Sequence, residues 1–243
     1  MNQPPPHGWH RQPPQGPYPP QQQGWQGHPP QPGWGPPPPP EKSKAPVIIT
    51  LSVVALLVLG GGITAAVLYF GAHEDGGSSK RSDQLPAACS NVSEAALKKA
   101  RTTNPNKRSS SETDLGRGKR TICSWNQTKG VDGEGLRNTD VYVTQDAEEE
   151  DNAYQQAVQM AMANTQGTPQ QKPLEGLGDE ATAVLMDGTS AFTDISIIVR
   201  KGDHVVEVDH TGWDVGVFSP KRADTAEFEA AARGIAEAMV SKL

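Results

Sequence analysis

The sequence predicts an α+β fold, in which an antiparallel sheet of about five strands has helices packed on one side. Two observations support this fold: a turn signal at Gly202-Asp203 between two alternating segments, and a helical apolar stripe within 223–242. A third observation, an uncharged apolar stretch over 47–70, predicts a membrane helix before the folded domain. The expected division is a disordered tail over 1–46, a transmembrane helix over 47–70, a linker over 71–85 and an extracellular domain over 86–243.

The tail over 1–46 consists mainly of Pro, Gln and Gly. It has too few aliphatic residues to offset the entropy of ordering a chain, so we expect disorder with polyproline II character. Trp9, Trp25 and Trp34 each adjoin a glycine and form a loose repeat. Two roles stay open, namely a docking arm for a partner that binds prolines and a spacer that needs only solubility.

The apolar stretch over 47–70 holds 24 consecutive uncharged residues, of which fourteen are Leu, Ile, Val or Phe. At about 1.5 Å per residue a helix of this length reaches roughly 36 Å, enough to cross a hydrocarbon core of about 30 Å. A cleaved signal peptide has a shorter core close to the start of the chain. The stretch therefore predicts a signal anchor in contact with lipid. Whether small residues between Gly60 and Ala66 pair two such helices into a weak homodimer is left open.

Charge and cysteine positions predict the orientation. Lys42 and Lys44 adjoin the start of the apolar stretch, whereas Lys80 and Arg81 lie about ten residues beyond its end. This asymmetry favours an N-terminus in the cytoplasm. Both cysteines follow the stretch, and an even count in one domain is typical of a disulfide in an oxidising compartment. We expect a single-pass protein of the plasma membrane with its C-terminal domain outside.

The domain is expected to open with a helix from about Asn91, where Glu94 stands three residues later as in a capping box. The polar, breaker-rich residues 103–119 predict a mobile loop. Segments 121–127 and 137–145 are predicted as paired strands joined by the glycine-rich residues 130–135. Their alternation places four residues on the inner face: Cys123, Trp125, Val141 and Val143.

A second helix is predicted over 152–164, after the acidic run 148–151. Those carboxylates suit the positive end of a helix, and no EF-hand spacing supports a calcium site there. One side of this helix carries Tyr154, Val158, Ala161 and Met162. A strand over 181–186 follows.

The hairpin around Gly202-Asp203 joins segments 193–201 and 204–211. Closing it at these two residues pairs Val199 with Val206 and Ile197 with Val208. One face is then apolar, and the other carries Asp194, Ser196, Arg200, Glu207 and Asp209. The last helix, over 223–242, repeats apolar residues at four-three-four spacing: Phe228, Ala232, Ile235 and Met239.

Cys89 precedes the first predicted helix and Cys123 lies in the first strand. A bridge between them closes a loop of about 35 residues, worth roughly 4 kcal/mol in the chain-entropy model. It would hold the helix to the sheet. A redox pair is the alternative, but the spacing is far from Cys-x-x-Cys.

Catalytic and cofactor motifs are weak. Gly176-Leu-Gly178-Asp179-Glu180 lacks the Gly-Lys-Ser/Thr of a phosphate loop and predicts a tight turn. Its two adjacent carboxylates would point apart in a strand, which does not suit an acid/base pair. His204 and His210 are about 20 Å apart along one strand, too far for one metal ion. The sequence contains no Gly-x-Ser-x-Gly elbow. We therefore expect a protein that is not an enzyme and has no cofactor or metal.

Three local patterns occur in order: ACSNVSEAAL at a helix start, Cys123-Ser124-Trp125 in a strand, and Gly176 to Ala181 before a strand. Together they resemble the domain-of-unknown-function 3558 family of actinobacterial envelope lipoproteins, and are similar to the extracellular sensor domain of a mycobacterial receptor Ser/Thr kinase. The resemblance covers about residues 86–243. It implies a secreted, disulfide-pinned α+β domain without established catalytic residues. Family members are often lipidated at an N-terminal cysteine, which the membrane helix replaces here, and the kinase sensor has more disulfides.

The charge balance limits the classes of partner that the chain is expected to bind. The chain has 22 basic and 28 acidic residues; three of the basic and one of the acidic precede residue 71, which leaves 19 against 27 in the remainder. A net charge of −8 argues against nucleic acid. The leading hypothesis is a non-catalytic binding or sensing domain for an unknown envelope ligand or protein partner. The alternative is a structural or assembly protein that links the envelope to cytoplasmic partners through the tail.

Overall fold

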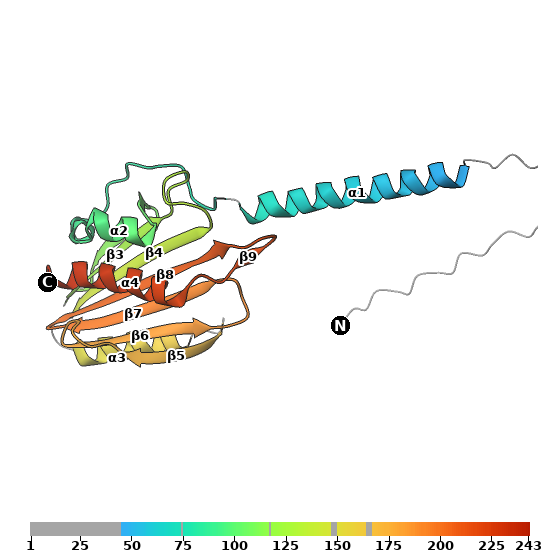
Figure 1. The fold of residues 1–243 in the computed structure, drawn as a ribbon. Coiled ribbons are helices and arrows are strands. Elements are labelled where there is room, and N and C mark those ends of the chain that lie inside the picture. Colours follow the sequence, from blue (N-terminus) through green and yellow to red (C-terminus); the bar gives the residue numbers. More distant parts are fainter. Residues whose placement is uncertain (1–44, 74, 117, 147–149, 164–166) are drawn as a thin grey trace, which may run out of the picture. The chain divides into compact units, whose positions relative to one another are not determined.

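A computed structural model of the chain describes residues 45–73, 75–116, 118–146, 150–163 and 167–243. Within them the fold is α+β, as predicted, with a nine-stranded antiparallel sheet and four α-helices (Figure 1). The tail predicted to be disordered lies outside the described residues up to position 44. The elements, in chain order, are α1 (Ala45–Ala72), the 3₁₀-helix η1 (Ala87–Asn91), α2 (Glu94–Ala100), β1 (Asn104–Pro105), β2 (Ser111–Asp114), β3 (Gly118–Asn126), β4 (Leu136–Asp146), α3 (Glu150–Met162), β5 (Thr168–Pro173), β6 (Glu180–Asp187), β7 (Thr193–Lys201), β8 (His204–Val215), β9 (Pro220–Lys221) and α4 (Thr225–Val240).

Helix α1 contains the predicted apolar span. Its segment Thr50–Gly71 is long and apolar enough to cross a membrane, and every side chain in it is exposed. The hydroxyl of Thr64 donates to the carbonyl of Gly60 at 2.8 Å, so this polar group is satisfied within the helix. A core helix of a soluble domain would be buried instead. The exposed apolar surface is what a lipid-facing helix presents.

The strand order in the sheet is β1-β3-β4-β8-β7-β6-β5, with β2 also paired to β3 and β9 to β8. The five predicted strands correspond to β3, β4, β6, β7 and β8. The others are short or polar edge elements that hydrophobic alternation does not reveal. Strands β1 and β2 lie within residues 103–119, predicted to be a loop, and pair with β3 through their backbones. Strand β5 contains Pro169 and Pro173, which an edge strand tolerates.

The hairpin register is as predicted. Val199 lies opposite Val206, and Ile197 lies opposite Val208. Strand β8 then pairs with β4 on its other side, which places Val141 opposite Val208 in the centre of the sheet. All four of these valines and Ile197 are fully buried or nearly so. The centre of the core therefore lies over β4, β8 and β7.

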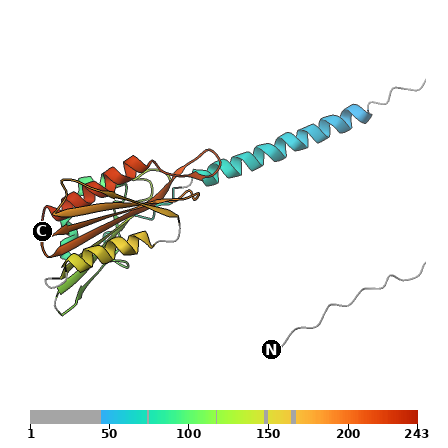
Figure 2. The same cartoon turned by 90° about the horizontal axis from the view of Figure 1, so that it is seen from below.

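Helices cover both faces of the sheet, so the prediction of helices on one side is wrong (Figure 2). Helices α2 and α4 pack on the face that carries Trp125, Val141 and Ile197. Helix α3 packs on the opposite face, where Tyr154 and Val158 meet a second apolar cluster. The strands contribute four residues to this second cluster, namely Val184, Met186, Ile198 and Val205.

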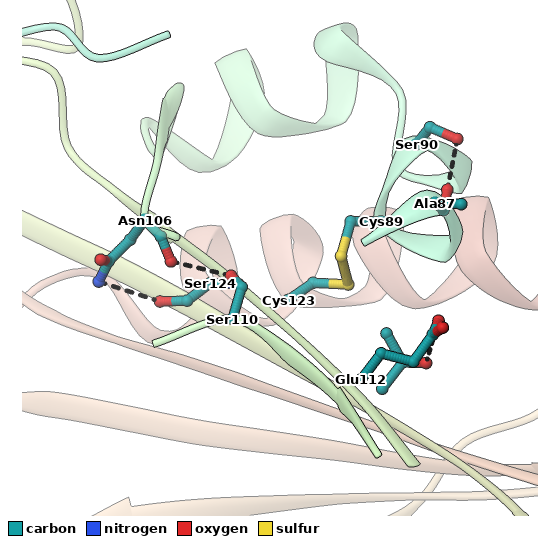
Figure 3. The surroundings of a disulfide bond; sticks show 9 residues. Ala87, Cys89, Ser90, Asn106, Ser110, Glu112, Cys123 and Ser124 are labelled. Atoms are coloured by element: carbon teal, nitrogen blue, oxygen red, sulfur yellow. Dashed lines mark hydrogen bonds between the residues drawn. A yellow bond between two sulfur atoms is a disulfide. The ribbon is translucent and has the colours of Figure 1, made fainter. Parts of the chain in front are cut away.

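The predicted disulfide joins Cys89 in η1 to Cys123 in β3, with their Cα atoms 5.5 Å apart (Figure 3). Both residues and Trp125 are buried in the main core. The following helix begins later than predicted, because Val92 is extended and Ser93, not Asn91, is its N-cap. The Ser93 hydroxyl accepts a hydrogen bond from the Ala96 N–H at 3.2 Å.

The segment predicted as a linker over 71–85 is bound to the domain from Asp75 onward. The carboxylate of Asp75 accepts hydrogen bonds from the N–H of Gly130 at 2.6 Å and from the amide of Gln127 at 3.0 Å. Further along, the amide of Asn104 donates to the backbone of Ser79 at 2.8 Å. We call residues 75–81 the strap.

Candidate functional site

Helix α3 covers one half of its sheet face and leaves the other half open. The open half consists of the outward side chains of β3, β4 and β8, which the strand register arranges in rows across the sheet. The first row is Asp140 and Asp209, next to the buried Ser124, the second is Ile122, Tyr142 and Glu207, and the third is Arg120 and Thr144, which continue toward Val205 under α3. We call this surface the open face.

A groove of about 210 Å³ lies between α3 and the open face. Tyr142, Thr144, Val205 and Glu207 come from the strands, and Arg120 lies at the edge. The remaining lining residues are Ala153, Gln156, Ala157 and Met160 of α3, with Leu115 from the connection between β2 and β3. Met160 is 72% exposed and Leu115 is 48% exposed. Large apolar side chains therefore stand in solvent at this groove, next to polar groups.

The polar groups of the groove are partly removed from water. The Arg120 guanidinium lies over the Tyr142 ring, 5.4 Å from its centroid. Burial, with the nearby Asp140 and Asp209 carboxylates, raises the pKa of Tyr142 to about 12, so its phenol stays protonated at neutral pH. Burial, reinforced by Asp209 and partly offset by Arg120, raises the pKa of Glu207 to about 7. Glu207 therefore titrates near neutrality at the floor of the groove.

Two further carboxylates lie next to the floor of the groove. Asp140 and Asp209 lie directly opposite each other on β4 and β8. The Ser196 hydroxyl donates to Asp209 at 2.6 Å. Burial nevertheless raises the pKa of Asp209 to about 6, and burial also raises that of Asp140. Like charges directly opposite destabilise a sheet, so this arrangement is unfavourable for folding.

The arrangement suits a ligand with an apolar part and a polar or cationic part. The apolar part would contact Met160 and Leu115, and the polar part would reach Glu207. The volume of the groove, about 210 Å³, is small. Pockets that enclose a drug-sized ligand usually measure roughly 300 Å³ or more. The groove therefore fits a side chain of a partner or a small ligand held against one wall. Among the described residues, no cluster of three His, Cys, Asp or Glu side chains is placed to hold a metal ion.

The residues that the sequence singled out lie elsewhere. Cys89, Cys123 and Trp125 belong to the face covered by α4, on the other side of the sheet from the groove. The glycine-rich segment forms a turn in which Gly176 has φ +72° and Gly178 has φ +65°. A side chain at Gly178 would meet the carbonyl oxygen of Arg200 at 2.5 Å, so the close backbone approach requires glycine.

The two carboxylates after this turn have structural partners. Asp179 accepts a hydrogen bond from the N–H of Gly202 at 2.7 Å and lies 3.7 Å from the Lys201 ammonium. Glu180 lies 3.7 Å from the Arg200 guanidinium. Both residues thus connect the start of β6 to the β7–β8 turn and take no part in the groove.

The two histidines of β8 also lie outside the groove. His210 is buried, with its ring centroid 4.5 Å from that of Phe228 and Nδ1 2.9 Å from the Thr139 hydroxyl. Burial lowers its pKa to about 3, so the ring is neutral. His204 lies 2.7 Å from the Asp203 carboxylate at the hairpin turn.

Sequence reasoning named Glu207 and Asp209 as a polar face but missed the other groove residues. Tyr142 lies between two buried valines on β4, and Arg120 precedes the buried Thr121 on β3, which does mark both as outward. Nothing local indicates that α3 lies beside them, because that placement depends on the pairing of β4 with β8. The groove is therefore a product of topology.

Neither a protein-family model nor a curated protein matches the chain. A solved structure that is similar is the extracellular domain of PknH from Mycobacterium tuberculosis. It is 11% identical in sequence, with a TM-score of 0.28, and the match covers 68% of this chain and 79% of that one. A likeness at this level carries no argument about function, and the resemblance to the domain-of-unknown-function 3558 family stays a prediction.

Proposed function

We propose that the chain is a single-pass membrane-anchored extracytoplasmic domain that binds or senses a ligand in the groove and does not catalyse a reaction. The observation that carries this proposal is the groove itself. It combines the exposed side chains of Leu115 and Met160 with the half-buried carboxylate of Glu207. Exposed apolar residues beside desolvated acids are unfavourable for folding, which supports a role in recognition.

The position in the membrane is supported by α1 and by the disulfide. The exposed apolar segment Thr50–Gly71 suits lipid. The bonded pair Cys89–Cys123 suits an oxidising compartment, since cytoplasmic thiols are kept reduced. Both features agree with a cytoplasmic N-terminus and an extracellular domain.

The chemistry of the groove supports binding without turnover. Among the described residues that line it, the hydroxyl groups are those of Tyr142 and Thr144. With a pKa of about 12, Tyr142 is protonated at neutral pH and cannot accept a proton, and no lining residue pairs a nucleophile with a histidine. Glu207, which titrates near pH 7, would instead make ligand affinity depend on pH.

Thiol labelling on intact cells tests the topology. A membrane-impermeant maleimide should label the chain only after treatment with a reductant, because both cysteines are bonded and the domain that carries them lies outside the cell. Both are buried in the native domain, so labelling follows the loosening of η1 that reduction allows. A cysteine introduced in the tail by Ser43→Cys is the matched control and should be labelled only after lysis. Labelling of Cys89 and Cys123 confined to lysed cells would reverse the orientation.

Thermal unfolding of the full chain in nanodiscs tests the groove. Fractions of an envelope extract are added, and one that holds a ligand should raise the melting temperature, because a ligand of the native state stabilises it by mass action. The Leu115→Ser/Met160→Ser variant should lose that shift. The Phe192→Ser variant, at an exposed position between β6 and β7, is the control and should keep it. Equal shifts in all three proteins would contradict binding in the groove.

The alternative role in assembly depends on the tail, most of which lies outside the described residues. Deletion of residues 1–40 separates the two roles. If localisation and partners stay unchanged in the deletion variant, the tail does not dock a partner. If partners are lost while the thermal shift persists, both roles operate.

A further inference from the structure

The strap fixes the point at which the chain enters the domain. The carboxylate of Asp75 accepts hydrogen bonds from Gly77, Gln127 and Gly130 at 2.6–3.0 Å. The N–H of Gly76 donates to the carbonyl of Gly135 at 2.9 Å. The first residues of the strap are therefore bound to the loop that joins β3 and β4.

The connection between this point and the apolar span is short. The span ends at Gly71, four residues before Asp75. Four residues extend over at most about 14 Å. With α1 in the bilayer, as in the proposed function, Asp75 must stay within that distance of the end of the span. The β3–β4 loop is thus held close to the membrane surface.

The hairpin of β8 and β9 leaves the domain at the same end (Figure 1). Gly135, to which the strap is bound, packs so closely on β8 that a side chain there would meet the carbonyl oxygen of Trp213 at 2.5 Å. Beyond Trp213 the ladder continues with two pairs, Asp214 with Lys221 and Val215 with Pro220. The hairpin tip, residues 216–219, therefore lies about 10 Å from the strap contact, at roughly 3.3 Å per residue.

The base of this hairpin is held by a buried cation. Arg137, on β4, is 1% exposed and donates to the carbonyl oxygen of Trp213 at 2.7 Å. Its guanidinium also forms an ion pair with Asp214. Removing one partner of a buried ion pair is strongly destabilising, so the hairpin is fixed to β4.

The tip itself is apolar and exposed. Val217 is 67% exposed and Phe218 is 52% exposed. Val131, on the β3–β4 loop to which the strap is bound, is 65% exposed. We propose that the β8–β9 tip and Val131 form a membrane-contact surface, which enters the interfacial layer of the same bilayer that α1 spans.

The short connection between α1 and Asp75 explains why so few apolar residues are enough for contact with the membrane. Two or three such side chains give too little buried area to hold a free protein on a membrane, since even a single acyl chain binds only reversibly. A domain already anchored within about 14 Å of the surface meets the bilayer at high effective concentration. Aromatic residues such as Phe218 and the half-buried Trp213 also suit the interfacial region. The contact would fix the orientation of the domain on the membrane.

Spin labels at the two ends of β8 test the proposal in the full chain, reconstituted in liposomes with the native disulfide intact. One label is attached through Ser219→Cys at the tip. The matched control is attached through Lys201→Cys, at the exposed end of β7, opposite His204 at the other end of β8. The twelve residues of β8 separate these ends by about 40 Å. Accessibility to dissolved oxygen is compared with accessibility to a water-soluble nickel chelate.

The expected result is an oxygen-to-nickel accessibility ratio several-fold higher at position 219 than at position 201. Val217→Ser/Phe218→Ser in the Ser219→Cys background should lower it to the control value. A tip label as open to the nickel chelate as the control would overturn the proposal. Protection that rises with the protein-to-lipid ratio would also overturn it, since it indicates a second copy as the occupant. Failure of the chain to float with the liposomes would instead contradict the proposed membrane anchor.

Discussion

The two faces of the sheet differ in polarity and in how completely helices cover them. The face under α2 and α4 is apolar, closed and crosslinked by the disulfide between Cys89 and Cys123. The open face beside α3 carries Asp140, Asp209 and Glu207, which are partly desolvated and close to one another. One face is organised for stability, and the other retains groups that reduce it. This contrast is the basis of the proposal that the open face binds a ligand.

Polar residues on the closed face behave differently from those on the open face. Arg137 is buried, but it forms an ion pair with Asp214 and lies over the Phe228 ring at 4.6 Å. His210 is buried as a neutral ring beside the same phenylalanine. Both have partners that compensate their burial. On the open face, the carboxylates face like charges.

The largest effect is expected from Phe228→Ala on the closed face. It removes a buried ring together with its contacts to His210 and Arg137. The free energy of unfolding should therefore fall by about 3–5 kcal/mol. Phe192→Ala is the matched control, because Phe192 is 42% exposed. Urea unfolding of both variants measures the difference. Equal losses would contradict a core centred under α4.

The next effect is expected from Cys89→Ala/Cys123→Ala, which removes the crosslink. Its loss should lower the free energy of unfolding by about 2–5 kcal/mol and loosen η1 and α2. Urea unfolding gives the stability, and hydrogen exchange in α2 gives the local effect. Wild-type protein treated with a reductant should match the variant. Unchanged stability would show that helix packing alone closes this face.

The two faces also differ in how far the sequence predicted them. Local pattern was sufficient for the closed face: the turn at Gly202-Asp203 set the pairing of Val199 with Val206, and alternation placed Cys123 and Trp125 inward. The helix on the second face of the sheet was not predicted, although the sequences of β6 and β7 indicate that both faces are covered. Val184, Leu185 and Met186 are consecutive apolar residues, as are Ile197, Ile198 and Val199, and such runs are typical of strands covered on both faces.

The groove depends on contacts far apart in the chain. Tyr142 lies opposite Glu207 only because β8 inserts between β4 and β7. Met160 reaches the same groove from α3. Helical periodicity predicted which side of α3 is apolar, but not which sheet face it covers. The polar strand β2 was missed because its four residues are all exposed and pair through the backbone.

A smaller and opposite effect is expected from Glu207→Gln on the open face. The folded chain raises the pKa of Glu207 from 4.5 to about 7, so it retains a proton that the unfolded chain releases. Stability from this group therefore falls as the pH rises from about 4.5 through about 7. The amide cannot ionise, so the variant should be more stable than wild type by roughly 1–3 kcal/mol at pH 8 and equal to it near pH 4.

Urea unfolding at several pH values measures this dependence. Glu134→Gln, at an exposed position in the β3–β4 loop, is the control. This surface substitution should change stability by less than about 0.5 kcal/mol at every pH. A variant at position 207 that is less stable than wild type at pH 8 would contradict the view that this carboxylate opposes folding.

The smallest effect on stability is expected from Met160→Gln in α3, because the Met160 side chain is 72% exposed. Its replacement should change the free energy of unfolding by less than about 0.5 kcal/mol. Val158, on the same helix, is 7% exposed and packs on the sheet. Val158→Ala should therefore cost about 1 kcal/mol or more.

The ligand-induced thermal shift should reverse this order, with the larger loss in Met160→Gln than in Val158→Ala. The reason is that Met160 lines the groove, whereas Val158 packs beneath it on the sheet. If Met160→Gln alters neither stability nor the shift, the exposed apolar wall has no part in binding, and the contrast between the two faces would reduce to packing alone.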